Sequence, residues 1–286
     1  MVKDTFFSPK RTLNCRGKVI NLSSPLVMGI INLTPDSFYD GGRYRHPMDA
    51  LRRAEALTDG GAHILDMGAA SSRPGAGIIA PEEEQQRLLP ALKAVVRQFP
   101  DAIISVDTYH SDTARRAVDE GAHMINDISA GRFDPTMIHT IAGLQVPYVI
   151  MHMQGTPSNM QKNPQYHDLI KEIAGFFSER LEKLREAGVH DIILDPGFGF
   201  GKTLEHNYQL LAQLDYFSMF ELPLLVGTSR KSMINKVLGT KAEDALNGTT
   251  IINTLALDKG ADILRVHDAK EANEAIKIID FYHNHT

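Results

Sequence analysis

The chain has 286 residues, of which 43% are hydrophobic, and carries a formal net charge of −5 at pH 7. This length suits one (β/α)₈ barrel or two ordinary domains, and the negative charge argues against general binding to nucleic acid, which needs a basic surface. Cys15 is the only cysteine, and neither a signal peptide nor an apolar run of ~18 residues is present, so we expect a soluble, cytoplasmic protein without disulfides or membrane spans.

Short apolar segments predict strands, and amphipathic segments between most of them predict helices. The first strand has no polar alternation, which is typical of a parallel strand buried on both faces. The eight predicted strands are residues 26–31, 63–67, 103–107, 124–127, 147–151, 191–195, 223–227 and 263–266. The predicted helices include residues 49–58, 82–97, 111–120, 168–187, 207–214 and 242–259.

The alternation of strands and helices predicts parallel βα units. Several helices end in glycine, as at Gly121 and Gly188, where a left-handed cap stops the helix shortly before the next strand. Because eight units are present, a closed (β/α)₈ TIM barrel is favoured over an open sheet. We expect one domain over residues 1–286, with an extension at 1–25 whose hairpin, residues 12–23, closes the bottom of the barrel.

Polar residues stand at or just after the ends of these strands, which in a barrel face one shared pocket. Any Asp or Asn taken alone would equally suit a helix cap or a turn. One set offers donors and acceptors for a flat, nitrogen-rich heterocycle: Asp107, Asn126, Asp195 and Lys231. A second set is polar and basic and suits phosphate or pyrophosphate: Asn32, Arg73, Arg265 and His267. Asn32 and Asp36 also carry oxygen atoms suited to Mg²⁺.

Residues 195–203 read DPGFGFGKT, which invites a nucleotide-binding interpretation. Pro196 stands where a P-loop requires its first glycine, and Lys202 stands where the dinucleotide fingerprint requires its third. The glycines instead allow the backbone to pass close to a flat ligand, with Phe200 lining the wall. Residues 227–232, which begin with Gly227, place backbone amides and two basic side chains at a helix start, where an anion would bind.

Two loops, residues 32–46 and 68–81, are long enough to act as lids over such a pocket. The remaining motif near a strand end, Met151-His152-Met153, is interpreted as barrel wall with one polar side chain.

Together these motifs resemble those of bacterial dihydropteroate synthases over about residues 19–279. The matching motifs are residues 29–38 (GIINLTPDSF), 72–75 (SRPG), 105–108 (SVDT), 125–129 (INDIS), 151–157 (MHMQGTP), 195–202 (DPGFGFGK), 229–232 (SRKS) and 265–268 (RVHD). Their joint occurrence in this order is far more specific than any single match. The family fold is a (β/α)₈ barrel, in agreement with the strand count.

The resemblance implies condensation of 6-hydroxymethyl-7,8-dihydropterin diphosphate with p-aminobenzoate to give 7,8-dihydropteroate and diphosphate. It implies a pterin pocket of Asp107, Asn126, Asp195 and Lys231, lined by Met151, Phe200 and Gly227. It implies a diphosphate site of Asn32, Arg73, Arg265 and His267, with Mg²⁺ at Asn32. It implies an aminobenzoate pocket of Phe38, Pro74, Lys231 and Ser232, with the substrate-binding residue Ser72 on a loop that folds over the site. Homodimerisation and sulfonamide inhibition are further expectations from the family.

The mechanism expected for these groups is largely dissociative. Diphosphate leaves the pterin methylene with help from Mg²⁺ and the basic set, and the aryl amine then attacks the resulting cation. The catalytic residues expected from this mechanism are Asp107, Asp195, Lys231, Arg265 and His267. The carboxylates of Asp107 and Asp195 flank and stabilise the cation, and no protein nucleophile is required.

The second loop departs from the family pattern. The family commonly has Glu-Ser-Thr-Arg-Pro where this chain has Ala70-Ser71-Ser72-Arg73-Pro74. Two alternatives therefore stay open. A corrinoid-dependent pterin methyltransferase would share the pterin pocket but needs no diphosphate site, and a catalytically idle pterin binder would show losses in the two lid loops.

Overall fold

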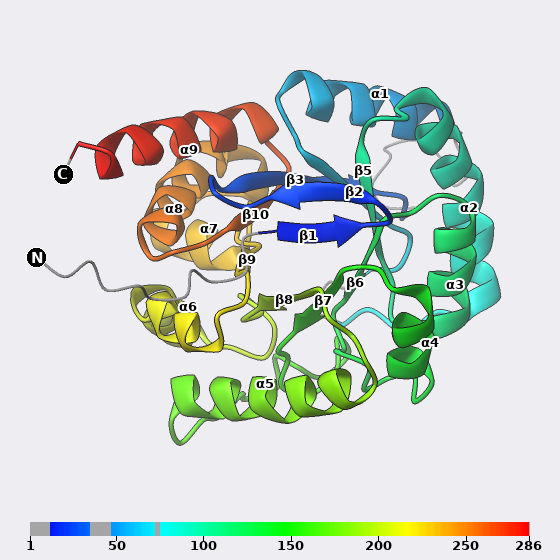
Figure 1. Cartoon of the computed structure of the whole chain (residues 1–286). Coiled ribbons are helices and arrows are strands. Elements are labelled where there is room, and N and C mark those ends of the chain that lie inside the picture. Colours follow the sequence, from blue (N-terminus) through cyan, green and yellow to red (C-terminus); the bar gives the residue numbers. More distant parts are fainter. Residues whose placement is uncertain (1–11, 35–46, 72–74, 286) are drawn as a thin grey trace, which may run out of the picture.

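The computed structural model of the chain describes residues 12–34, 47–71 and 75–285. Eight parallel strands form one sheet in the order β8-β7-β6-β5-β4-β3-β10-β9. These strands are β3 (Leu26–Asn32), β4 (Ile64–Gly68), β5 (Ile103–Asp107), β6 (Met124–Asp127), β7 (Tyr148–Met151), β8 (Ile192–Asp195), β9 (Leu225–Val226) and β10 (Ile263–Val266). A parallel bridge between Leu194 and Leu224 joins the two edges of this sheet, so the predicted barrel is confirmed (Figure 1).

Helices surround the barrel (Figure 1). They are α1 (Pro47–Asp59), α2 (Pro81–Gln98), α3 (Ser111–Asp119), α4 (Met137–Leu144), α5 (Leu169–Glu186), α6 (Leu204–Ala212), α7 (Ser232–Leu238), α8 (Leu246–Asp258) and α9 (Ala269–His283). Gly121 and Gly188, after α3 and α5, have φ angles of +106° and +84°, as the predicted left-handed caps require. In the part of the chain described, no helix is both apolar enough and long enough to cross a bilayer.

Two predicted helices differ from those observed. The helix expected at 207–214 begins earlier, because the Thr203 hydroxyl accepts a hydrogen bond from the His206 amide and His206 Nδ1 accepts one from the Thr203 amide. This capping box starts α6 at Leu204. The helix expected at 242–259 is two elements, a 3₁₀ turn at Ala242–Asp244 and α8.

The predicted N-terminal hairpin is present as β1 (Thr12–Cys15) and β2 (Lys18–Asn21), paired antiparallel. Its buried residues Leu13 and Cys15 join a hydrophobic cluster formed by the inward-facing residues of the barrel strands. The hairpin turn is held by Arg16, which donates to the Val118 carbonyl at 2.6 Å, near the end of α3. The hairpin therefore closes the end of the barrel opposite the carboxyl ends of its strands, as expected from the sequence.

The main core lies between the barrel strands and their helices, and it buries the other face of each strand. A separate apolar cluster lies in the loops that follow the strands. Its members are Tyr109, Ile128, Met151, Met153 and Met160, with Ala70, Phe133 and Phe200 packed against them. Since both strand faces are covered, the free polar chemistry of this fold is concentrated where the strands end.

Candidate active site

A single guanidinium joins three strands of the barrel near their carboxyl ends. Arg265 of β10 donates from Nε to Asp66 Oδ2 of β4 at 2.6 Å and from Nη2 to Asp107 Oδ2 of β5 at 2.8 Å. The same Asp66 oxygen accepts a hydrogen bond from Asn126 Nδ2 of β6 at 3.1 Å. These four side chains form one network, so the orientation of each depends on the others.

Burial controls the charge in this network. The Asp66 side chain is fully buried, and its second oxygen, Oδ1, has no hydrogen-bond partner among the described residues. Burial raises the pKa of Asp107 to about 7; the positive charge of Arg265 opposes this shift and the negative charge of Asp66 adds to it. Burial also disfavours the charged form of Arg265, but the two carboxylates outweigh it and raise the pKa of the guanidinium.

The glycine-rich loop after β8 forms a second part of the site. Asp195 Oδ1 accepts a hydrogen bond from the Gly197 amide at 2.7 Å. Lys231 Nζ donates to the Phe198 carbonyl at 2.6 Å and lies 4.7 Å from the centroid of the Phe200 ring. Burial lowers the pKa of Lys231 to about 8, an effect that the negative charge of Asp195 opposes. The loop thus presents a carboxylate, an ammonium and an aromatic face together.

Lys202, the lysine of the Gly-Lys-Thr sequence, is directed into the protein. It is only 2% exposed, and its Nζ donates to the carbonyls of Gly197 and Phe200 at 2.9 and 3.2 Å and contacts His152 Nδ1 at 3.1 Å. Burial lowers the pKa of this amine to about 7. Lys202 therefore holds the glycine-rich loop from inside, which supports the interpretation of residues 195–203 as a structural loop without P-loop chemistry.

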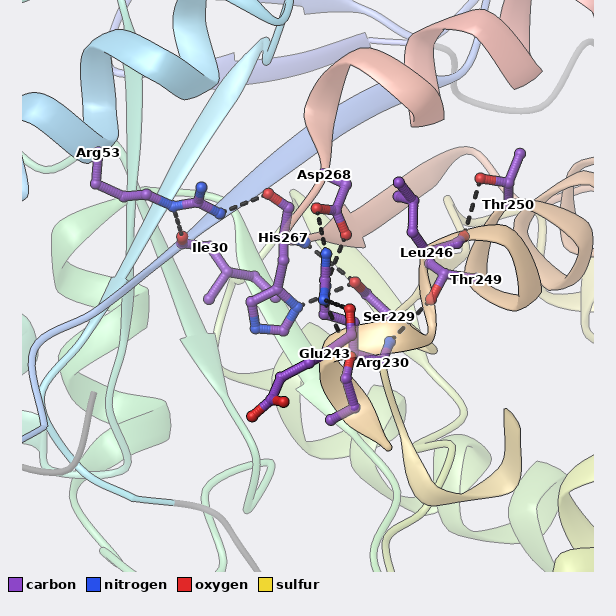
Figure 2. Close-up of polar contacts among 11 residues, drawn as sticks. Ile30, Arg53, Ser229, Arg230, Glu243, Leu246, Thr249, Thr250, His267 and Asp268 are labelled. Atoms are coloured by element: carbon purple, nitrogen blue, oxygen red, sulfur yellow. Dashed lines mark hydrogen bonds and ion pairs between the residues drawn. The ribbon is translucent and has the colours of Figure 1, made fainter. Parts of the chain in front are cut away.

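The third part of the site lies where β10 ends and α7 begins (Figure 2). The Ser229 hydroxyl accepts a hydrogen bond from the His267 amide at 3.1 Å and lies 3.0 Å from Nδ1 of the same residue. Arg230 forms two hydrogen bonds with the Asp268 carboxylate, at 2.9 and 2.8 Å. Burial lowers the pKa of His267 to about 4, and the charge of Arg265 adds to this effect, so the imidazole is neutral at pH 7.

The Ser229 contacts fit a neutral His267 that carries its ring hydrogen on Nε2. The hydroxyl oxygen already accepts a hydrogen bond from the His267 amide, and its hydrogen is available to Nδ1. With Nδ1 as acceptor, the ring hydrogen of the neutral imidazole is on Nε2. In this tautomer His267 would be a neutral hydrogen-bond donor beside Arg265, a combination suited to an oxyanion.

Comparison with known proteins identifies the family to which the chain belongs. Residues 28–267 match the model of a family described as pterin binding enzyme. The dihydropteroate synthase of Escherichia coli K12 is 43% identical over 270 residues, which cover 94% of this chain and 95% of that protein. The chain belongs to the dihydropteroate synthase family.

Solved structures of this family have the same fold. The Yersinia pestis dihydropteroate synthase in a sulfonamide drug complex superposes with a TM-score of 0.91 at 42% identity, covering 96% of this chain and 99% of that one. The Xanthomonas albilineans dihydropteroate synthase with 4-aminobenzoic acid has a TM-score of 0.89 at 38% identity, covering 96% and 98%.

The structure brings together most of the site residues predicted from the sequence. Those that lie at the carboxyl end of the barrel are Asn32, Asp107, Asn126, Met151, Asp195, Phe200, Gly227, Lys231, Ser232, Arg265 and His267. Arg265 was expected beside His267 in the set of residues that binds the anion. Its hydrogen bonds to Asp66 and Asp107 show that it also contacts the set expected to bind the pterin. Phe38, Ser72, Arg73 and Pro74 lie outside the described residues, as does Asp36, so their roles stay predictions.

Asp66 stands near the end of a predicted strand, among the residues expected to face the shared pocket, but the sequence assigned it to neither polar set. Its signal is visible in the sequence, because it is a carboxylate within the apolar strand Ile64-Leu65-Asp66-Met67. A charged group in a strand buried on both faces requires a partner. The sequence could not identify that partner, Arg265, which is 199 residues away.

The close approach of the glycine-rich loop to β7 gives a testable prediction. Gly197 has a φ of +74°, and a Cβ there would lie 1.9 Å from the His152 carbonyl oxygen. Gly188 has a similar φ of +84° with nothing within 4 Å of the Cβ position, so Gly188→Ala measures the backbone strain alone. In urea unfolding we expect Gly188→Ala to cost about 1–2 kcal/mol and Gly197→Ala at least about 3 kcal/mol. Equal costs would contradict the close contact.

Proposed function

We propose that the chain is a transferase that condenses 6-hydroxymethyl-7,8-dihydropterin diphosphate with p-aminobenzoate, releasing 7,8-dihydropteroate and diphosphate in folate biosynthesis. The observation that carries the proposal is the network in which Arg265 joins Asp66, Asp107 and Asn126 at the carboxyl end of the barrel. Membership of the dihydropteroate synthase family supports it. A cytoplasmic location, expected from the single cysteine, is part of the same proposal.

The pterin is expected to bind between the carboxylate network and the glycine-rich loop. Its ring nitrogens and amino group match the carboxylates of Asp107 and Asp195 and the amide of Asn126, while Lys231 can donate to the ring carbonyl. Met151 is buried beside Phe200 in the apolar cluster of the loops, and together they offer a flat wall for the ring. The pocket thus combines an apolar slot with a few convergent polar groups, as small-molecule sites do.

The reaction begins when the bond between the pterin methylene and the diphosphate oxygen breaks, with its electron pair leaving on the diphosphate. The positive charge that develops on the pterin meets the carboxylates of Asp107 and Asp195, which are fixed by Arg265 and by the Gly197 amide. The amine nitrogen of p-aminobenzoate then bonds to the methylene carbon and loses a proton to solvent water. His267 and Arg265 donate hydrogen bonds to the departing oxyanion.

Mg²⁺ is proposed as a metal that arrives with the diphosphate. The described residues contain no group of three or more His, Cys, Asp and Glu that could hold a metal ion by themselves. Asn32 offers one exposed amide oxygen at the end of β3, which fits an ion held by few protein ligands and by substrate phosphates. Asn32 would hold the ion, whose chemistry when bound is to neutralise charge on the leaving group.

The p-aminobenzoate pocket is proposed at the opening of the site. Lys231 and Ser232 lie there at the start of α7, and Phe38 and Pro74 of the two long loops complete the proposed pocket. Ser72 and Arg73 belong to the second of these loops, and Arg73 is proposed to contact the diphosphate. Relatives of this chain have been solved with 4-aminobenzoic acid and with a sulfonamide drug, and we infer that sulfonamides compete for the same pocket here.

The proposal is tested by diphosphate release from the dihydropterin diphosphate with Mg²⁺, measured with and without p-aminobenzoate. We expect release that depends on the amine and is matched by formation of 7,8-dihydropteroate. Pterin binding without amine-dependent release would contradict the proposal and favour an idle pterin binder. Methyl transfer from methyltetrahydrofolate to a corrinoid protein would favour the methyltransferase.

The raised pKa of Asp107 predicts a pH dependence. Its carboxylate is ionised only above a pKa of about 7, so kcat/KM for the dihydropterin diphosphate should rise as the pH increases through this range and level off above it. In Asp107→Asn we expect kcat to fall on the order of 10²-fold and this step in the pH profile to disappear. Asp119→Asn, on the exposed side of α3, is the control and should keep the wild-type profile.

A homodimer is also proposed, through α7 and α8. Exposed apolar side chains gather on these neighbouring helices: Val237 at 58%, Leu238 at 50%, Ile251 at 50% and Leu255 at 47%. Sedimentation velocity should show a dimer that Ile251→Glu converts to a monomer, because a charge would be buried in the contact. Phe281→Glu, on α9, should leave the dimer intact; a monomeric wild-type chain would contradict the proposal.

A further inference from the structure

Two adjacent arginines of α1 have different surroundings. The Arg52 side chain is 75% exposed, and its nearest carboxylate, that of Asp49 on the same helix, is 3.7 Å away. Arg53 is partly buried and points from α1 toward the barrel. Its Nε donates to the Ile30 carbonyl at 3.2 Å and its Nη2 to the His267 carbonyl at 2.5 Å (Figure 2).

These two carbonyls lie where the pairing between β3 and β10 stops. The last residues paired between the two strands are Gly29 and Val266, and Ile30 and His267 are the next residue on each side. Arg53 therefore bridges the two chain segments just beyond their last strand pair. Since the His267 amide is bound by Ser229 and its carbonyl by Arg53, the main chain of His267 is held from both sides.

Arg53 also differs in its hydrogen-bond partners from Arg230 and Arg265, the other arginines near His267. Arg230 is bound to the Asp268 carboxylate, and Arg265 is shared between two carboxylates. The hydrogen bonds found for Arg53 in the described residues go to main-chain carbonyls, and no carboxylate there is within ion-pair distance of it. Because His267 is neutral, Arg53 carries the excess positive charge among the described side chains around His267, where partial burial weakens screening by water.

We propose that Arg53 is a positioning residue of the diphosphate subsite, which holds the main chain of His267 and supplies positive charge that attracts the anion. This inference rests on the proposed function, because that function places the diphosphate at His267. It adds a residue from a barrel helix to a site otherwise built from strand ends and loops. The ligand class is a diphosphate group, whether free or attached to the pterin methylene.

The experiment measures binding of inorganic diphosphate with Mg²⁺ by isothermal titration calorimetry, and binding of 6-hydroxymethylpterin, which lacks the diphosphate. In Arg53→Gln we expect the Kd for diphosphate to rise about tenfold and its dependence on salt to weaken, while the Kd for the pterin stays within about twofold. Arg52→Gln changes the same charge one residue away and should bind both ligands as the wild type does.

Arg53→Lys separates the effect of the positive charge from that of the hydrogen bonds to the main chain. It also provides a test if Arg53→Gln fails to fold. Its ammonium keeps the charge but cannot bridge both carbonyls as the planar guanidinium does, so the diphosphate Kd should rise by less than in Arg53→Gln, with pterin binding unchanged. In turnover, the KM for the dihydropterin diphosphate should rise in both variants, while the KM for p-aminobenzoate should not.

Three outcomes would overturn the inference. The first is wild-type affinity for diphosphate in Arg53→Gln. The second is an equal loss of diphosphate and pterin affinity in either variant, which would mean that Arg53 only stabilises the barrel. The third is a wild-type chain that binds no diphosphate. If diphosphate binding depends on Arg53 but no amine-dependent release occurs, the subsite stands and the proposed reaction fails.

Discussion

The rest of the site depends on the sharing of one guanidinium between two buried carboxylates. Arg265 joins β10 to β4 and β5, and Asp66 passes the connection on to Asn126 of β6. Removing two charges from water costs several kcal/mol per ion, and a single arginine cannot fully repay this for two carboxylates. The remaining deficit appears as the raised pKa of Asp107. The raised pKa of this carboxylate is thus a consequence of the sharing of Arg265 between two buried carboxylates.

The balance of charge also differs between the pterin side of the site and its third part, the corner around Arg230, His267 and Asp268 where the anion is proposed to bind. On the pterin side, Arg265 and Lys231 face Asp66, Asp107 and Asp195, so the described side chains leave no excess positive charge. At the corner, the pair of Arg230 and Asp268 is balanced and His267 is neutral, so Arg53 is the arginine without an ion-pair partner among the described residues there. A cationic pterin intermediate and an anionic leaving group would therefore meet surroundings of opposite sign, which favours their separation.

The barrel and the position of its site could be predicted from the sequence because both follow from local patterns. Apolar strands that alternate with amphipathic helices predict parallel βα units, and polar residues at strand ends then have only one face to occupy. The partners of Asp66 and Arg53 could not be predicted in this way. Strand periodicity assigns Asp66 to a face but not to Arg265, and helix periodicity does not say which of Arg52 and Arg53 bridges two strands.

Lys202 shows the converse difficulty, since a local pattern there pointed toward the wrong chemistry. Gly-Lys-Thr at the start of a helix suggests phosphate binding, and only the spacing of the preceding residues argued against it. In the folded chain the amine lies inside the loop and donates hydrogen bonds to the carbonyls of Gly197 and Phe200. The lysine and the glycines therefore have the same structural role: they hold the backbone that carries Asp195 and Phe200 in place.

The departure at Ala70 can be understood from its surroundings. Ala70 packs against an apolar cluster that contains Met151 and Phe200, the two residues proposed to line the pterin pocket. A little further along the same loop, the Gly75 amide donates to the Pro157 carbonyl at 3.0 Å, so the second loop is attached to the loop after β7. A carboxylate at position 70 would need a partner beside these apolar groups, whereas a methyl group needs none. The alanine therefore suits this apolar contact, which lies between the second loop and the residues proposed to line the pterin pocket.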